Sequence, residues 1–221
     1  MAQKTVAVIG TTGLIGSFIT GLLKEDTSIE TIRLIVRRPI TDTHPKVEIK
    51  LVNFEDYESL KLAIDGCQSV FCAVGTTQKK VQGDKLAYRK ADYDVPVHAA
   101  RASLETRCDQ FLLVSAVGAN AKSSNFYLQL KGEVEEAIQK FPIPFISIFR
   151  PSMLLGPRKE FRLGEKIGQV ASKLVAPLLA GKLKKYKPIE AKDVASAMVN
   201  NSKENKPGVT IFEYAEMQLN H

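Results

Sequence analysis

The chain contains few of the residues that build disulfide or metal frameworks. It has three cysteines and three histidines in 221 residues. The cysteines, Cys67, Cys72 and Cys108, lack the paired short spacing of zinc sites, and the histidines are scattered. We therefore expect buried thiols, no disulfide framework and no metal.

Linkers, internal repeats and low-complexity tracts are also absent, which favours one domain over residues 1–221. The early apolar run Thr5–Ile9 is too short to span a membrane and has no signal-peptide core. We expect a soluble, cytoplasmic protein with no membrane partner. Nothing in the sequence indicates the oligomeric state.

Charge is biased towards the positive side. The 31 basic and 24 acidic residues give a net charge of +7, which suits phosphate-rich ligands and, less specifically, nucleic acid. The densest basic run, Lys182–Lys187, alternates in part and is typical of a lysine-protected edge strand. We favour that interpretation over a nucleic-acid patch and expect no nucleic-acid partner.

Short β-branched apolar runs alternate with longer helical patterns, which predicts an α/β fold with a doubly wound, Rossmann-like parallel sheet. The predicted strands are Thr5–Ile9, Thr31–Val36, Glu48–Val52, Ser69–Ala73, Gln110–Ser115 and Phe145–Phe149. The clearest predicted helices are Gly13–Lys24, Lys85–Leu104 and Asn125–Lys140. Such a sheet places ligands beyond the carboxyl ends of its strands.

The pattern becomes less regular after Arg150-Pro151. A helix over Glu190–Asn200 and a strand over Val209–Phe212 are predicted there. We interpret residues 151–221 as a small C-terminal extension on the substrate side, too short for a large second domain.

A glycine-rich turn, Gly10-Thr-Thr-Gly13-Leu-Ile-Gly16, follows the first strand and opens the first helix. Gly10 permits a tight turn, Gly13 lets backbone N–H groups approach a pyrophosphate, and Gly16 permits close helix packing. The helix N-terminus adds partial positive charge. A plain turn is the alternative, but the order of strand, turn and helix favours dinucleotide binding.

The second strand ends in Arg37-Arg38, where a carboxylate would be needed to bind a ribose 2′-hydroxyl. Arginine there can pair with a 2′-phosphate, which favours NADP (NADPH) over NAD. At the end of the fourth strand, Gly75 is a candidate to let the backbone contact the ribose side of the cofactor, although an ordinary strand-to-helix turn explains it equally well.

Tyr127 and Lys131 lie four residues apart on a predicted helix and follow Ser115, at the end of an apolar strand. On one helix face, the Lys131 ammonium would favour the Tyr127 phenolate, and Ser115 would hold a substrate oxygen. A second match, Tyr57 and Lys61, has no serine-bearing strand end shortly before it, so we interpret Tyr57 as an ordinary helix residue.

Together these motifs resemble the short-chain dehydrogenase/reductase superfamily, specifically its atypical members, with the closest likeness to the Tat-interactive protein family of oxidoreductase-like proteins. The specific stretch is Lys122–Glu135, and the likeness fades after about residue 160. The resemblance implies pyrophosphate contacts from Thr12, Gly13, Leu14, Ile15 and Gly16, and 2′-phosphate contacts from Arg37 and Arg38. It also implies that Val74 and Gly75 lie along the cofactor, that Tyr127 and Lys131 contact the ribose and that Leu154 packs near the nicotinamide. A phosphate contact from Arg162 is implied as well. Asn53 replaces the usual aspartate near the adenine.

The sequence thus favours an NADP-dependent oxidoreductase acting on a small carbonyl or alcohol, with Tyr127, Lys131 and Ser115 as catalytic residues. The main alternative is a non-catalytic NADP(H) sensor that regulates a protein partner. A sugar-nucleotide epimerase shares the chemistry but needs a larger C-terminal lobe. Substrate identity lies in the variable segment after Pro151 and is not predicted.

Overall fold

The computed structural model describes residues 4–76, 81–156, 181–204 and 206–219. Seven of the described strands form one sheet in the order β3-β2-β1-β4-β5-β6-β9, and every pairing in it is parallel. The strands are β1 (Lys4–Ile9), β2 (Ile29–Val36), β3 (Val47–Leu51), β4 (Ser69–Cys72), β5 (Gln110–Val114), β6 (Phe145–Phe149) and β9 (Gly208–Phe212). The strand order reverses at β1, so the predicted doubly wound Rossmann-like sheet is confirmed.

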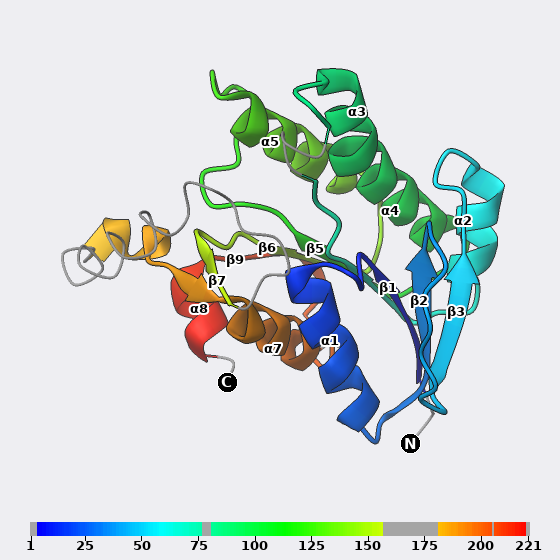
Figure 1. The fold of residues 1–221 in the computed structure, drawn as a ribbon. Helices are drawn as coiled ribbons and strands as arrows, with labels where there is room; N and C mark the ends of the chain where they lie inside the picture. The colour runs from blue at the N-terminus through cyan, green and yellow to red at the C-terminus, as the bar shows by residue number, and fades with distance from the viewer. Residues whose placement is uncertain (1–3, 77–80, 157–180, 205, 220–221) are drawn as a thin grey trace.

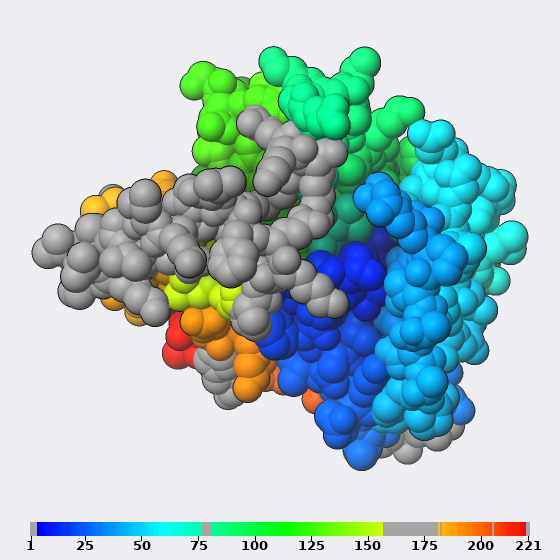
Figure 2. Space-filling model, in the orientation of Figure 1, coloured from blue at the N-terminus to red at the C-terminus, as the bar shows by residue number. Residues whose placement is uncertain are grey.

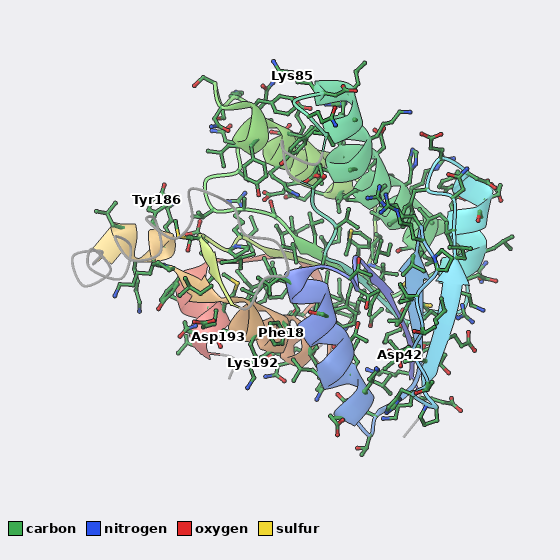
Figure 3. All side chains as sticks on the ribbon, viewed as in Figure 1. Phe18, Asp42, Lys85, Tyr186, Lys192 and Asp193 are labelled. Carbon is green, nitrogen blue, oxygen red and sulfur yellow. The ribbon has the colours of Figure 1, made fainter. Side chains whose placement is uncertain are left out.

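Helices cover both faces of the sheet (Figure 1). One face carries α1 (Leu14–Glu25), α7 (Ala191–Asn201) and α8 (Tyr214–Leu219); the other carries α2 (Tyr57–Ile64), α3 (Lys85–Arg89), α4 (Val95–Glu105) and α5 (Phe126–Ile138). Helices α1 and α7 lie side by side, as the labelled Phe18, Lys192 and Asp193 show (Figure 3).

Each face of the sheet has its own apolar core. Ile19 and Met198 belong to the core under α1 and α7, and Leu60 and Val134 to the core under α2, α4 and α5. A strand buried on both faces needs apolar side chains in both directions, so the central strands read as continuous apolar runs. The space-filling view shows α3–α5, in green, and the β2–β3 edge, in blue to cyan, as two flanks of the molecule (Figure 2).

The six predicted main strands and the later strand are present with ends within two residues of the predicted ones. The predicted first helix, the helix before β6 and the helix before β9 are confirmed with the same tolerance as α1, α5 and α7. None of the helices in the described ranges is long and apolar enough to cross a membrane.

The helix predicted over Lys85–Leu104 is not one regular α-helix. A π-helical turn, η1 (Lys90–Asp94), joins α3 to α4. In this turn the N–H of Val95 donates to the carbonyl oxygen of Lys90, five residues earlier. Wide turns of this kind are rare and often occur at functional sites, and no residue pattern marked this one in advance.

The edge strand predicted for the basic run Lys182–Lys187 is wrong. The chain there forms a 3-10 helix, η3 (Gly181–Tyr186), whose labelled Tyr186 lies far from the sheet (Figure 3). The Lys187 N–H donates to the Lys184 carbonyl oxygen at 3.0 Å. The sheet edge beside β6 is taken by β9 instead.

Residues after Pro151 contribute directly to the main body. β9 extends the seven-stranded sheet and α7 packs on the core beside α1. Two short strands, β7 (Leu154–Leu155) and β8 (Ile189–Glu190), pair in parallel above that core. Arg162, implied as a phosphate contact, lies outside the described residues.

Two glycines of α1 offer a matched test of the packing between this helix and β1. A Cβ at Gly16 would overlap the carbonyl oxygen of Gly10, whereas a Cβ at Gly21 would meet nothing within 4 Å. Gly16→Ala should therefore lower the free energy of unfolding by about 1–3 kcal/mol, measured by urea unfolding. Gly21→Ala should raise it by about 0.5–1 kcal/mol, because alanine favours a helix interior. Equal effects of the two substitutions would contradict the packing.

Candidate cofactor and active site

The glycine turn after β1 is pressed against the end of β4. Gly10 has a φ of 92°, and a Cβ on it would lie 2.5 Å from the carbonyl oxygen of Ala73. The Gly13 N–H closes the turn by donating to the Gly10 carbonyl oxygen at 2.9 Å. Glycine is therefore needed at position 10, because the backbone at the end of β4 takes the space that a side chain would fill.

The start of α1 is free to receive an anion. No described side chain caps its N-terminus at Gly13, whereas Asp56 and Asn125 cap α2 and α5. The N–H groups of the first helical turn have no partner within the helix, and the helix dipole is positive there. Thr12 and Gly13 are exposed. The predicted pyrophosphate residues, Thr12, Gly13, Leu14, Ile15 and Gly16, thus lie at an uncapped helix start, and their contact with a pyrophosphate stays a prediction.

Arg37 and Arg38 directly follow β2, the neighbour of β1 on one side, and both are exposed. They lie at the same edge of the sheet as the glycine turn, because parallel strands end together. Asn53 is used locally: its Oδ1 accepts the Glu55 N–H at 3.1 Å in the turn before α2. The basic pair is therefore available at the place where a 2′-phosphate is expected.

Val74 and Gly75 follow β4, the other neighbour of β1. Val74 is half-buried against the core under α4 and α5, and Gly75 is exposed. Leu154, in β7, packs on the opposite core beside α1. The predicted cofactor residues thus lie on both sides of the glycine turn at the switch point between β1 and β4.

Tyr127 and Lys131 lie in the first two turns of α5. The Tyr127 side chain is 37% exposed, whereas Lys131 is buried at 4%. The Lys131 Nζ is 6.0 Å from the centroid of the Tyr127 ring. The structure therefore brings the two predicted residues together, with the phenol open to a substrate and the ammonium behind it.

The Lys131 ammonium pairs with a carboxylate that the sequence did not single out. Asp92, in η1, places its Oδ1 3.0 Å from the Lys131 Nζ. Burial alone would lower the pKa of Lys131, but the charge of Asp92 and the nearby Tyr127 outweigh it, and the pKa is raised. Lysine is thus held in its charged form. No sequence signal singled out Asp92, because it lies in the mixed charged run Arg89–Asp94, which has a second aspartate at position 94.

Ser115 has a different partner from the predicted one. Its hydroxyl donates to the Glu135 carboxylate, which also accepts three hydrogen bonds from the Nε and Nη2 atoms of the Arg150 guanidinium. Ser115 and Glu135 are 4% and 2% exposed. This network ties the ends of β5 and β6 to α5, so the substrate-holding role of Ser115 stays a prediction.

The second tyrosine–lysine pair has a structural use. Tyr57 begins α2, and its phenol lies near Glu105 on α4; burial and that carboxylate raise its pKa to about 12. Lys61 pairs with the same Glu105 at 2.9 Å. The pair links α2 to α4, as expected for an ordinary helix residue.

In the described part of the chain, no group of three or more His, Cys, Asp or Glu residues could hold a metal ion.

The profile of a family described as NAD(P)H-binding matches residues 10–204. The chain belongs to this family. It is 32% identical to the protein HTATIP2 of Rattus norvegicus over 168 residues, which cover 75% of this chain and 69% of that protein. It is also 32% identical to the mitochondrial protein FMP52-1 of Scheffersomyces stipitis over 227 residues, with 95% of each chain covered. The resemblance to the atypical short-chain dehydrogenase/reductases is thus confirmed.

Solved structures agree on the fold of this NAD(P)H-binding protein. The Bordetella bronchiseptica enzyme WbmH in complex with NAD+ matches with a TM-score of 0.73 and 16% identity, covering 96% of this chain and 76% of that one. MoeE5 in complex with UDP-glucose and NAD matches with a TM-score of 0.72 and 12% identity, covering 95% and 75%. At these identities the likeness concerns the Rossmann-like fold alone.

Two buried serines test the network around Glu135. Ser115→Ala removes a donor to a buried carboxylate, so the free energy of unfolding should fall by about 1.5–3 kcal/mol. The control, Ser147→Ala, removes a bond to the neutral amide of Asn201 and should cost about 0.5–1.5 kcal/mol. Urea unfolding measures both. A smaller loss for Ser115→Ala than for Ser147→Ala would contradict the network.

Proposed function

We propose that this protein is an NADP-dependent oxidoreductase that transfers a hydride between nicotinamide and a small carbonyl or alcohol. The observation that carries the proposal is the pairing of an exposed Tyr127 with a buried, charged Lys131. The pair lies on α5, at the same end of the sheet as the uncapped start of α1. This arrangement supports the proposal, because the predicted dinucleotide site and the predicted proton-exchanging pair lie at one end of the sheet.

The choice of NADP rests on Arg37 and Arg38. Their guanidinium groups are exposed and follow β2 without an intervening acidic residue. A planar guanidinium binds a phosphate through charge-assisted bonds and stacks on an adenine face. A carboxylate, which NAD binding commonly uses at the ribose 2′-hydroxyl, is not found at either position.

A bound nicotinamide supplies or accepts the hydride at its C4 atom. In the reducing direction Tyr127 would donate its phenolic proton to the carbonyl oxygen, and the carbonyl carbon would take up the hydride that a bound cofactor supplies. Lys131 stabilises the phenolate that remains, since an ammonium favours a nearby anion. Tyr127 then regains a proton from solvent, to which its side chain is open.

Ser115 favours a second candidate. Because its hydroxyl proton is given to Glu135, the serine has no second proton for a substrate oxygen. A non-catalytic NADP(H) sensor that acts through a protein partner would need Tyr127 and Lys131 only to hold the ribose.

For either function we propose a cytoplasmic location, although FMP52-1 of Scheffersomyces stipitis is called mitochondrial.

The two tyrosine–lysine pairs give a matched test of turnover. The assay follows loss of NADPH absorbance with p-nitrobenzaldehyde and phenanthrenequinone as carbonyl probes. Tyr127→Phe should lower the rate on the order of 10²–10⁴-fold, because the proton donor is lost, and leave NADPH affinity within about three-fold. Tyr57→Phe removes the same hydroxyl from the other pair and should leave the rate within about two-fold.

Retention of the rate in Tyr127→Phe would contradict the assignment of the proton donor. Binding of NADPH without consumption of it by the wild-type protein would favour the sensor over the oxidoreductase.

A further inference from the structure

Lys131 and Asp92 form a fully buried ion pair inside the site. Their side chains are 5% and 1% exposed, and Nζ and Oδ1 are 3.0 Å apart. Burying two charges costs desolvation that an apolar pair of the same size would avoid. Packing between α5 and the helix after β4 therefore does not require these residues, and their presence calls for another reason.

The π-helical turn sets the position of Asp92. The turn Lys90–Asp94 interrupts the helix between α3 and α4, and Asp92 is its buried member. One extra residue in the turn rotates the following side chains relative to a regular α-helix. The carboxylate is thereby presented inward, between the end of β4 and α5, while Lys90 pairs with Glu55 at the exposed side at 2.9 Å.

The second oxygen of Asp92 holds the segment after β4. Oδ2 accepts the Thr76 N–H at 2.7 Å, and the Tyr88 hydroxyl donates to the Thr76 carbonyl oxygen at 3.3 Å. A Cβ on Gly75 would lie 3.8 Å from Oδ1 of Asp92. One carboxylate thus joins the backbone of the predicted cofactor segment, Val74–Thr76, to the ammonium of Lys131.

Among the described residues, the titratable groups that act on the Lys131 ammonium are Asp92 from η1, Tyr127 from α5 and Cys72 from β4. Burial raises the pKa of the Cys72 thiol to about 11, so this thiol is neutral near pH 7. Asp92 is therefore the full negative charge that offsets the burial of Lys131.

We propose that Asp92 is a positioning residue for the reaction: its carboxylate fixes the Lys131 ammonium behind Tyr127 and couples it to the backbone of Val74–Thr76. This proposal rests on the proposed function. Binding of the cofactor ribose and orientation of Lys131 then depend on the same carboxylate. Loss of the charge should disturb both, although Asp92 does not touch the reacting atoms.

The test uses Asp92→Asn, in which the amide oxygen can still accept the Thr76 N–H but the charge is gone. Lysine side-chain NMR of the cofactor-free protein measures the pKa of Lys131 and so reports on the ion pair. The Lys131 signal is the one that disappears in Lys131→Met. Without the charge of Asp92, nothing of full charge offsets the burial of the Lys131 ammonium, so the pKa of Lys131 should fall by about one unit or more. The alkaline limb of kcat/KM for NADPH-dependent carbonyl reduction should move to lower pH by the same amount.

At neutral pH, Asp92→Asn should lower kcat/KM on the order of 10-fold or more, because small displacements of a catalytic group are costly. The control is Glu55→Gln. It removes the exposed ion-pair partner of Lys90, which lies in the same π-helical turn as Asp92, and should leave kcat/KM within about two-fold. If Asp92→Asn does not fold, Asp92→Glu keeps the charge but displaces it. That variant should lower kcat on the order of 10-fold with an unchanged pH limb.

Asp92→Asn could lower the pKa of Lys131 but leave kcat/KM and the alkaline limb of its pH profile as in the wild-type protein. That result would overturn the proposal and leave the proposed function intact. Wild-type kcat in Asp92→Glu would also overturn it. If the wild-type protein neither binds nor consumes NADPH, the proposed function fails and the positioning role fails with it. The NMR titration would then identify the ion pair as structural only.

Discussion

The contact between Gly16 and the carbonyl oxygen of Gly10 is the constraint on which the site depends. It lets α1 start directly beyond β1 and aims the free N–H groups of the first helical turn along the carboxyl end of the sheet. The same turn is pressed on Ala73 at the end of β4. Arg37 follows β2, Gly75 follows β4 and Tyr127 lies on the helix after β5, so a cofactor bound at this turn would lie between them.

Buried charge on α5 fixes the other half of the site. Lys131 and Glu135 are four residues apart on one helix face, and each meets a partner from another element, Asp92 or Arg150. An apolar helix face could slide or rotate at small cost, but a buried ion pair has a single good geometry. The two pairs therefore hold Tyr127 at a fixed height above the sheet.

Local patterns predicted the sheet well, because strands such as Phe145–Phe149 are buried on both faces and carry continuous apolar runs. Contacts between distant residues were not predictable. Asp92 and Lys131 are far apart in the chain, and the π-helical turn that joins them has no propensity signal. The Lys182–Lys187 run was misread as a strand, although its apolar residues, Leu183 and Tyr186, are three positions apart, which is the period of a 3-10 helix.

The central claim is that the glycine turn and the two arginines bind NADP. Titration with NADPH and NADH at fixed salt, followed by ligand fluorescence, tests it directly. NADPH should bind about 10-fold tighter or better, and Arg37→Ala with Arg38→Ala should abolish the preference. Lys203→Ala with Lys206→Ala makes the same charge change away from the predicted cofactor residues and should preserve it. Failure to bind either nucleotide, or a preference that survives without the arginines, would contradict the account.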